Sequence, residues 1–398
     1  MNGAPCAVLV AADIRFPLQR ANGVQTVKTA DALARAGLRT RLLVRHSDPR
    51  GTSEVLEHYG LSAGSGLEVR RLHVLHRAGL FSMPRALFLA QALPRAATWM
   101  RGGGLVFTRD LQLADLLVRG GGRRVVYEAH AVEALMYAER GALYGTGERP
   151  SPRKQARLRA RERRVWTRAA GVVTTTAGIR DSLEAAFGSR PRVRVVPNGC
   201  DAPPAALPAL SAEDPPRVLY AGQLYPWKGV DVLVEAMAEV PRATLVVLGG
   251  LAGERDAERV RAAVAARGLL ARAEMPGTVP LTRVREELAR AAVVVVPVLR
   301  TAMTERHTSP LKAFEAMAAG RPLVASDLPS SREVLRDGET ALLVPPGDAR
   351  ALADALRRLL ADRALAARLA EGAWREAAAY SWEARAVRLR GLFDEVCA

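Results

Sequence analysis

Short runs of apolar residues recur along the chain, separated by segments with helical or loop character. In the first half the runs cover residues 6–13, 39–44, 67–74, 105–109, 123–130, 171–176 and 192–199. Runs of this length are typical of strands buried in a parallel sheet. Residues 24–37 place Val27, Leu33 and Ala34 on one helical face. The first run, this helix and the next run therefore predict a β-α-β unit.

The same alternation restarts after a proline-rich stretch. Residues 202–216 contain five prolines and no periodicity, a composition typical of a semi-rigid linker. Residues 217–237 predict a strand, a loop and a helix, and further strands are predicted at 243–250, 293–299, 322–326 and 341–348, with a loop at 275–280 and a last helix at 381–396. We predict an α/β protein with two doubly wound, Rossmann-like domains at 1–201 and 217–378, a linker at 202–216, and a final segment at 379–398.

The most informative stretch is the run from 307 to 335. Ser309 is a good helix N-cap, and Pro310 suits the first helical position. An anion in front of this helix would be held by the backbone N–H groups of Leu311 and Lys312 and by the Lys312 ammonium. Glu315 lies one turn after Leu311 and carries a carboxylate suited to sugar hydroxyls. This pattern predicts a phosphate site with a sugar-binding carboxylate beside it.

This stretch resembles the donor-site motif of retaining glycosyltransferases of family 4, which share the two-domain GT-B fold with an interdomain cleft. In that family two glutamates separated by seven residues hold the donor. Glu315 matches the second, which binds the nucleotide ribose, whereas His307 stands at the first, which contacts the transferred sugar. The tetrapeptide at 309–312 replaces the more usual loop containing Phe-Gly.

Other stretches of the second half resemble the same family, among them residues 381–396, which resemble its terminal helix and imply that the segment at 379–398 crosses back to the first domain. Residues 217–237 are similar to its G-R-L…K-G motif, so the resemblance implies that Lys228 contacts the donor diphosphate. Gln223 replaces the usual arginine, and Lys312 could compensate. Gly249 and Gly277 lie where the resemblance implies loops that flank the nucleobase; plain turn chemistry would also explain both glycines.

The resemblance to the first half is weaker. Gly23 matches a loop that approaches the donor diphosphate or the acceptor, although an ordinary loop glycine is an equal reading. His130 ends a predicted strand, beside Glu128, where the family has its active-site histidine. Arg109 and Asp110 also follow a strand; they could line the acceptor site or pair with each other.

Charge is unevenly distributed along the chain. Lys and Arg exceed Asp and Glu by 17, and the whole excess lies in residues 1–200. Residues 151–171 hold eight basic residues and one acid and predict a long surface helix. Such a face suits peripheral contact with anionic lipid or another anionic partner. Only four of the 58 basic residues are lysine, so the excess could instead reflect a general use of arginine.

Cysteine usage and hydropathy indicate the compartment. Cys6, Cys200 and Cys397 are far apart and form no CxxC pair, which argues against a disulfide framework and a zinc site. No signal peptide or membrane span is apparent, because no apolar stretch approaches 18 residues. We therefore expect a cytoplasmic protein, with possible association at the inner face of the plasma membrane.

The function that the resemblance implies is sugar transfer from a nucleoside-diphosphate sugar to an acceptor hydroxyl, without a metal or other cofactor. The acceptor is unknown and could be lipid-linked or anionic. Alternatives are a sugar-nucleotide epimerase on the same fold and a catalytically silent partner subunit. A nucleic-acid-binding protein is disfavoured, because no nucleic-acid motif accompanies the charge.

Overall fold

The computed structural model describes residues 6–18, 20–61, 64–74, 84–251 and 253–398. Contacts divide the chain into two compact units. The first unit contains Met1–Tyr137, Ser151–Asn198 and Trp382–Ala398, and the second contains Ala138–Pro150 and Gly199–Ser381. The division differs from the predicted boundaries because residues 138–150 group with the second unit.

The first unit is built around a parallel sheet with the order β3-β2-β1-β4-β5-β6-β7. Its strands are β1 (Val8–Phe16), β2 (Thr40–His46), β3 (Glu68–His73), β4 (Leu105–Thr108), β5 (Val125–Ala129), β6 (Gly171–Thr174) and β7 (Val193–Val195). The order reverses at β1, whose two neighbours are β2 and β4. This is the doubly wound arrangement that the sequence predicts.

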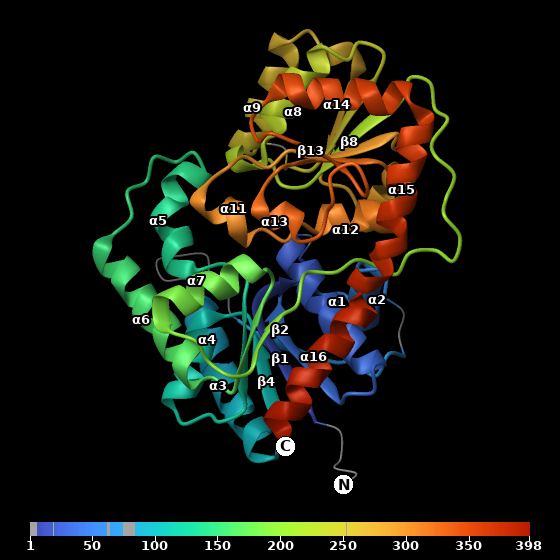
Figure 1. Ribbon diagram of the computed structural model, residues 1–398. Helices are drawn as coiled ribbons and strands as arrows, with labels where there is room; N and C mark the ends of the chain where they lie inside the picture. The colour runs from blue at the N-terminus through green and yellow to red at the C-terminus, as the bar shows by residue number, and fades with distance from the viewer. Residues whose placement is uncertain (1–5, 19, 62–63, 75–83, 252) are drawn as a thin grey trace. The chain divides into compact units, whose positions relative to one another are not determined.

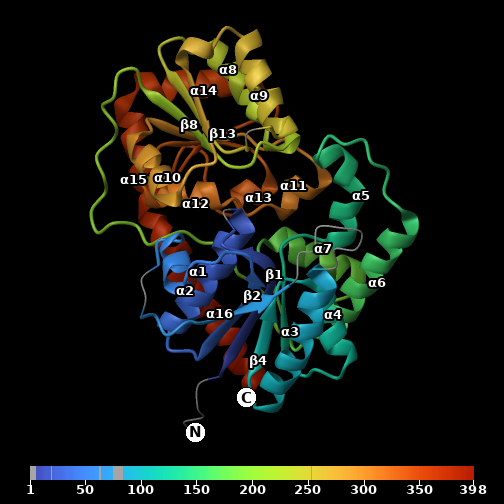
Figure 2. The same ribbon diagram turned by 180° about the vertical axis from the view of Figure 1, so that it is seen from behind.

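Helices cover both faces of this sheet (Figures 1 and 2). They are α1 (Ala21–Arg35), α2 (Thr52–Glu57), α3 (Pro84–Arg101), α4 (Leu111–Arg119), α5 (Glu133–Leu143), α6 (Pro152–Arg168), α7 (Ala177–Phe187) and α16 (Trp382–Cys397). Apolar side chains of α3, α4, α6 and α7 share one core with the sheet. On the other face, α16 lies beside α1, and Phe393 packs edge-on against Phe107 of β4.

The second unit repeats the plan with the parallel strand order β10-β9-β8-β11-β12-β13. Its strands are β8 (Arg217–Ala221), β9 (Thr244–Leu248), β10 (Ala273–Gly277), β11 (Val293–Val296), β12 (Leu323–Ser326) and β13 (Leu342–Val344). Its helices are η1 (Pro226–Lys228), α8 (Val230–Ala238), α9 (Arg255–Ala266), η2 (Leu270–Arg272), α10 (Leu281–Arg290), α11 (Ala302–His307), α12 (Leu311–Ala318), α13 (Pro329–Arg332), α14 (Ala349–Ala361), α15 (Arg363–Ala377) and η3 (Ala378–Tyr380). Two apolar cores, one on each face of the sheet, hold these helices in place.

Two local predictions are wrong. Residues 275–280 were expected to form a loop, but Met275, Pro276 and Gly277 belong to strand β10. Because β10 is at the edge of the sheet, Pro276 is tolerated there, although a proline argues against a strand from sequence. Helix α1 begins at Ala21, three residues before the predicted start, so Gly23 lies inside its first turn.

The proline-rich stretch lies along the second unit. Residues 202–216 form no helix or strand. Arg321 donates to the carbonyl oxygen of Ala209 at 2.7 Å, and Leu210 packs against the core of this unit. Arg290 forms an ion pair with Glu213 at 2.6 Å. The stretch is therefore a packed part of the second unit rather than a spacer.

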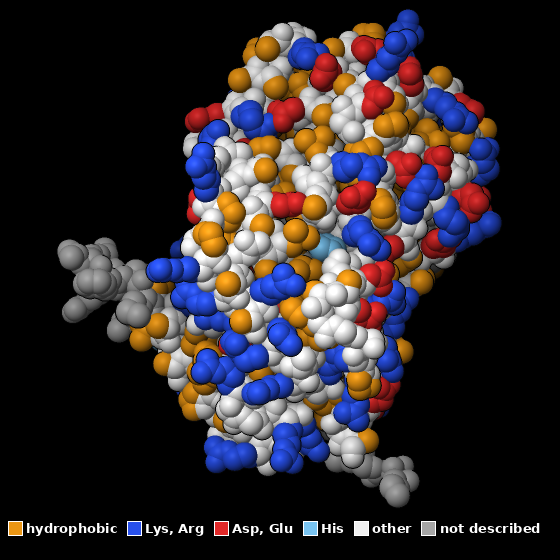
Figure 3. All heavy atoms as spheres, turned by 60° about the vertical axis from the view of Figure 1, so that its left-hand side comes forward, with side chains coloured by type: hydrophobic (Ala, Val, Ile, Leu, Met, Phe, Trp, Pro, Cys, Tyr) orange, Lys and Arg blue, Asp and Glu red, His pale blue; other side chains and the backbone are white. Residues whose placement is uncertain are grey.

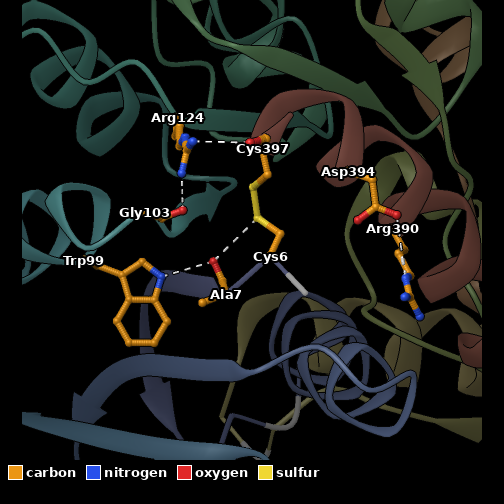
Figure 4. The surroundings of a disulfide bond; sticks show 8 residues. All are labelled: Cys6, Ala7, Trp99, Gly103, Arg124, Arg390, Asp394 and Cys397. Carbon is orange, nitrogen blue, oxygen red and sulfur yellow. Dashed lines mark hydrogen bonds and ion pairs between the residues drawn. A yellow bond between two sulfur atoms is a disulfide. The ribbon is translucent and has the colours of Figure 1, made fainter. Parts of the chain in front are cut away.

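The cysteine spacing argues against a disulfide framework, yet the structure contains one disulfide. Cys6, just before β1, and Cys397, the last residue of α16, form a disulfide (Figure 4). Arg124 donates to the carbonyl oxygen of Cys397 at 3.2 Å and also contacts that of Gly103. The two cysteines are 391 residues apart in the chain, and only the return of α16 to the first sheet brings them together.

Among the described residues, no helix has the length and apolar character that crossing a lipid bilayer requires.

Candidate active site

The carboxyl ends of β8 and β11 form the switch point of the second sheet. The sheet order reverses between these two neighbouring strands, so the loops that follow them lead to opposite faces. The loop after β8 carries Gln223 and Lys228, both of which the sequence singles out. This is the position at which doubly wound sheets bind nucleotides.

Backbone contacts fix the loop that carries Lys228. Gly229, directly after the lysine, has a φ of 72°. A Cβ at this position would lie 1.8 Å from the carbonyl oxygen of Pro297, which follows β11. The N–H of Leu299 donates to the carbonyl oxygen of Trp227 at 2.9 Å. The loops after β8 and β11 therefore support each other, and only glycine fits at 229.

Lys228 has no acidic partner among the described residues of the chain. Its Nζ lies 4.0 Å from the ring centroid of Trp227. Burial lowers the pKa of the Lys228 ammonium from 10.5 to about 8. A desolvated ammonium without a carboxylate is costly in the ligand-free protein and is suited to receive an anion.

The two glycines predicted to flank the nucleobase have structural explanations. Gly249 has a φ of 138°, and a Cβ there would lie 1.8 Å from the carbonyl oxygen of Gly222. Gly277 has a φ of 80°, and its Cβ would lie 3.2 Å from the carbonyl oxygen of Gly250. Close packing between the loops after β8, β9 and β10 accounts for glycine at both positions, and contact with a nucleobase stays a prediction.

Helix α12 differs in detail from the predicted phosphate site. Its N-cap is Pro310 rather than Ser309, and no side chain caps it. Leu311 is buried in the first turn. Lys312 and Glu315 lie three residues apart and pair directly, with 2.5 Å between Nζ and Oε2. The lysine predicted for the diphosphate and the carboxylate predicted for the ribose thus neutralise each other in the ligand-free protein.

His307 and Gln223 occupy the positions where the sequence departs from the family motif. His307 is the last residue of α11, and only 3% of its surface is exposed. The side chain of Gln223 is half-buried, and its backbone carbonyl accepts a hydrogen bond from the Tyr220 hydroxyl at 2.5 Å. Contact of either residue with a donor sugar or a phosphate stays a prediction.

In the first unit, His130 belongs to a buried polar network at the end of β5. Its Nε2 lies 3.1 Å from Oε2 of Glu128. Arg385 of α16 pairs with the other oxygen of Glu128 and donates to Thr29 Oγ1 at 3.1 Å. Burial, followed by the nearby Arg109 guanidinium, lowers the pKa of His130 to about 4. Burial alone would raise the pKa of Glu128, but Arg385 and His130 bring it below its ordinary value.

Arg109 and Asp110 point to different partners, so the idea that they pair with each other is wrong. Arg109 donates to Oε1 of Gln25 at 3.1 Å, and Gln25 donates through Nε2 to Glu128 at the same distance. Asp110 caps α4 and forms an ion pair with Arg85 at 2.8 Å. Arg109 therefore belongs to the His130 network, whereas Asp110 has a structural task.

Gly23 is also explained by packing within the first unit. A Cβ at this position would lie 2.3 Å from the carbonyl oxygen of Leu18. The contact places the loop after β1 against the first turn of α1. Contact of the same turn with a ligand stays a prediction.

Sequence reasoning missed Gln25, Trp227 and Arg385. Arg385 gave a usable signal, because it falls on the apolar stripe of α16 beside Ala386 and Leu389, where a charged side chain requires a buried partner. Gln25 and Trp227 gave none, since their roles depend on residues far along the chain or on the path of a loop.

Comparison with known proteins identifies both units. Residues 22–199 match the family described as "Glycosyl transferase 4-like domain", and residues 215–362 match "Glycosyl transferases group 1". Both regions of the chain therefore match glycosyltransferase families. The sequence resemblance is confirmed at this level.

Relatives and solved structures agree with this assignment. The chain is 31% identical over 282 residues to a D-inositol 3-phosphate glycosyltransferase of Xylanimonas cellulosilytica, which covers 67% of this chain and 66% of that protein. Sucrose-phosphate synthase of Thermosynechococcus elongatus superposes with a TM-score of 0.75 at 23% identity, covering 98% of each chain. HepE of Anabaena, solved in complex with UDP and glucose, gives a TM-score of 0.70 at 18% identity and covers 96% of this chain and 98% of its own. These likenesses show that the protein has the GT-B fold.

Proposed function

We propose that the protein is a retaining glycosyltransferase that moves a sugar from a nucleoside-diphosphate sugar to an acceptor hydroxyl. The observation that carries the proposal is Lys228, a desolvated ammonium without an acidic partner, held at the switch point of the second sheet. The two matched domains supply the reaction class. We assign the product to synthesis of cell-surface polysaccharide, lipopolysaccharide or glycolipid.

In this mechanism the main task is to neutralise the departing nucleoside diphosphate. Lys228 does so by charge, because an ammonium in a desolvated site stabilises a developing oxyanion far better than one in water. The first turn of α12 adds backbone N–H groups. We propose that these groups replace a divalent metal, and a transfer assay in excess chelator tests that: retained turnover is expected.

The other predicted site residues contact either the nucleotide part or the sugar part of the donor. Glu315 exchanges its ion pair with Lys312 for the hydroxyls of the ribose, which leaves Lys312 to face the diphosphate. In the first unit, His130 is neutral at pH 7, because its pKa is about 4. A neutral imidazole both donates and accepts hydrogen bonds, which suits contact with a sugar hydroxyl.

The known ligands of similar proteins support a nucleotide-sugar donor. HepE was solved with UDP and glucose, and with UDP-glucose. The Xylanimonas relative is named for a phosphorylated inositol, which makes an anionic acceptor a reasonable first choice for assay.

A thermal-shift screen with UDP-, GDP- and ADP-sugars tests the proposal. A donor at 100 times its dissociation constant adds about 2.7 kcal/mol to the free energy of unfolding, so one nucleotide series should raise the melting temperature clearly. The anomeric configuration of the product then separates retention from inversion, and an epimerase would convert the donor without any acceptor. If none of the three series shifts the melting temperature, the proposal fails.

We further propose that the first unit contacts anionic membrane through α6. Arg153, Arg157, Arg159 and Arg163 are exposed on this helix and form no ion pair with described residues. Figure 3 shows blue basic side chains gathered, with few acidic ones, on the face that carries α6. Val165 and Trp166 are buried in the core of the same unit, so the contact is electrostatic rather than apolar.

Co-sedimentation with vesicles tests this contact. Binding to vesicles rich in anionic lipid, and not to neutral vesicles, is expected at low salt. Reversing Arg157 and Arg163 to Glu should abolish it, whereas reversing the exposed Arg350 and Arg358 of α14 should change it little. Equal loss in both variants would point to net charge rather than to α6.

A further inference from the structure

A row of aromatic rings leads from residues 138–150 to the ammonium of Lys228. The ring of Tyr144 lies edge-on to Tyr225, with 4.9 Å between centroids. Tyr225 stacks on Trp227 at 6.4 Å and an interplanar angle of 20°. Trp227 in turn presents its face to Nζ of Lys228 at 4.0 Å. The ammonium therefore sits at the end of three contacting side chains.

Residues 138–150 are fastened to the second unit by contacts beyond Tyr144. Nη1 of Arg255 donates to the carbonyl oxygen of Gly145 at 2.9 Å. Gly145 has a φ of 60°, and a Cβ there would lie 3.2 Å from Cγ of Pro226. Oε2 of Glu139 accepts a hydrogen bond from the N–H of Met303 at 3.0 Å. The segment thus holds both the loop after β8 and the start of α11.

The row explains how Lys228 keeps one position without an acidic partner. The face of an indole carries partial negative charge and attracts an ammonium, most strongly when both are desolvated. A carboxylate in its place would hold the ammonium as firmly but would neutralise it. An indole leaves the charge available to an incoming anion.

We infer that Tyr144, Tyr225 and Trp227 are positioning residues that hold the Lys228 ammonium ready for the donor diphosphate, and that residues 138–150 are therefore part of the donor site. The inference rests on the proposed function, because it names what prepares the diphosphate contact. The inference goes beyond the proposed function because it assigns a role to residues 138–150, which lie in the first half of the sequence.

Calorimetric binding of UDP, GDP and ADP tests the inference, using whichever nucleotide the wild-type protein binds. Trp227→Leu keeps an apolar side chain but removes the ring face, and should weaken binding about 10-fold, which is about 1.4 kcal/mol and lies within the range of a desolvated cation–π contact. Trp227→Phe restores a ring and should recover most of the affinity. Tyr144→Leu should weaken binding about 3-fold, and Tyr144→Phe should not.

A double-variant cycle separates positioning from general loss of structure. In a Lys228→Met background the ammonium is absent, so Trp227→Leu should change affinity less than about 2-fold. Trp374→Leu removes a half-buried tryptophan of α15 in the same unit and serves as the matched control, with unchanged affinity expected.

The outcomes distinguish the inference from the proposed function. If the wild-type protein binds none of the three nucleotides, the proposed function fails. If Lys228→Met weakens binding but Trp227→Leu is equally harmful with and without Lys228, the positioning role is overturned and the donor site stands. Failure of Trp227→Phe to recover affinity would likewise overturn it.

Discussion

The charged side chains at the carboxyl ends of the two sheets have different kinds of partner. In the first unit, Glu128 at the end of β5 is matched by Arg385, and His130 and Gln25 complete a closed network. In the second unit, Lys228 follows β8 with only the face of Trp227 against it. The buried carboxylate of the first end has a guanidinium beside it, and the Arg109 guanidinium there donates to an amide oxygen, whereas the Lys228 ammonium of the second end has only a ring face as its partner.

This difference separates a structural charge from a functional one. A buried ion pair is expensive to break, so Glu128 and Arg385 fix the position of His130 and join α16 to the sheet. An unpaired, desolvated lysine lowers stability and is retained for binding. Partner geometry, rather than the number of charged residues, therefore marks the donor site. The first unit illustrates this, because it carries the whole net charge of +17.

The largest expected effect comes from breaking the closed network. Arg385→Met leaves the Glu128 carboxylate buried without its cation, which should lower the free energy of unfolding by about 3–5 kcal/mol. Denaturant titration measures the loss. Arg388→Met, an exposed residue on the same helix, is the control and should change stability by less than about 0.5 kcal/mol.

The double variant Glu128→Leu, Arg385→Met sharpens that result. Replacing both charges by apolar groups removes the uncompensated carboxylate, so stability should recover well above that of Arg385→Met alone. A double variant no more stable than the single one would show that the network contributes something other than charge pairing.

Catalysis should depend instead on Lys228, at the carboxyl end of the second sheet. Lys228→Ala removes the contact to the leaving diphosphate and should cut turnover about 100-fold, the effect of losing one oxyanion donor worth about 3 kcal/mol. Stability should not fall, because the variant also removes a desolvated charge. Unchanged transfer would remove the assignment of Lys228.

The pH dependence follows from the lowered pKa of Lys228. Below pH 8 the ammonium is protonated and attracts the diphosphate; as pH rises through about 8 the charge is lost. The kcat/KM for the donor should therefore fall above pH 8, and Lys228→Arg should move that limit upward, because arginine stays charged. A wild-type profile that stays flat to pH 10 would contradict the assignment.

The smallest effect is expected at Lys312. Its ammonium already pairs with Glu315. Lys312→Ala should therefore weaken nucleotide binding by only a few-fold, because such an ion contact contributes about 0.5 kcal/mol to the free energy of binding. Parallel titrations of the Lys228 and Lys312 variants measure the ratio. An equal loss in both would mean that Lys312 neutralises the diphosphate as strongly as Lys228 does.

Most of the fold could be predicted from the sequence. Each apolar run became a strand, because residues buried on both faces of a parallel sheet leave a continuous hydrophobic signal. Strand β10 was not predicted, since it contains Pro276 and Gly277, and Pro276 is acceptable only at a sheet edge, which the sequence does not reveal.

The site could be predicted only in part. Lys228 was found because it lies in a local motif beside a glycine. The partners that set its state were not, because Tyr144 meets Tyr225 across a large sequence separation, as Arg385 meets Glu128. Pairings of this kind depend on the completed fold, as does the disulfide between Cys6 and Cys397.

Proton-linked calorimetry of nucleoside diphosphate binding tests the central claim most directly. Burial lowers the pKa of Lys228 to about 8, so the free protein should bind and release a proton at this side chain near that pH. Bound diphosphate would raise that pKa, so titrations in two buffers of different ionisation enthalpy should show proton uptake by the wild-type protein and none by Lys228→Arg. Binding without proton uptake, or no binding of UDP, GDP or ADP, would contradict the account.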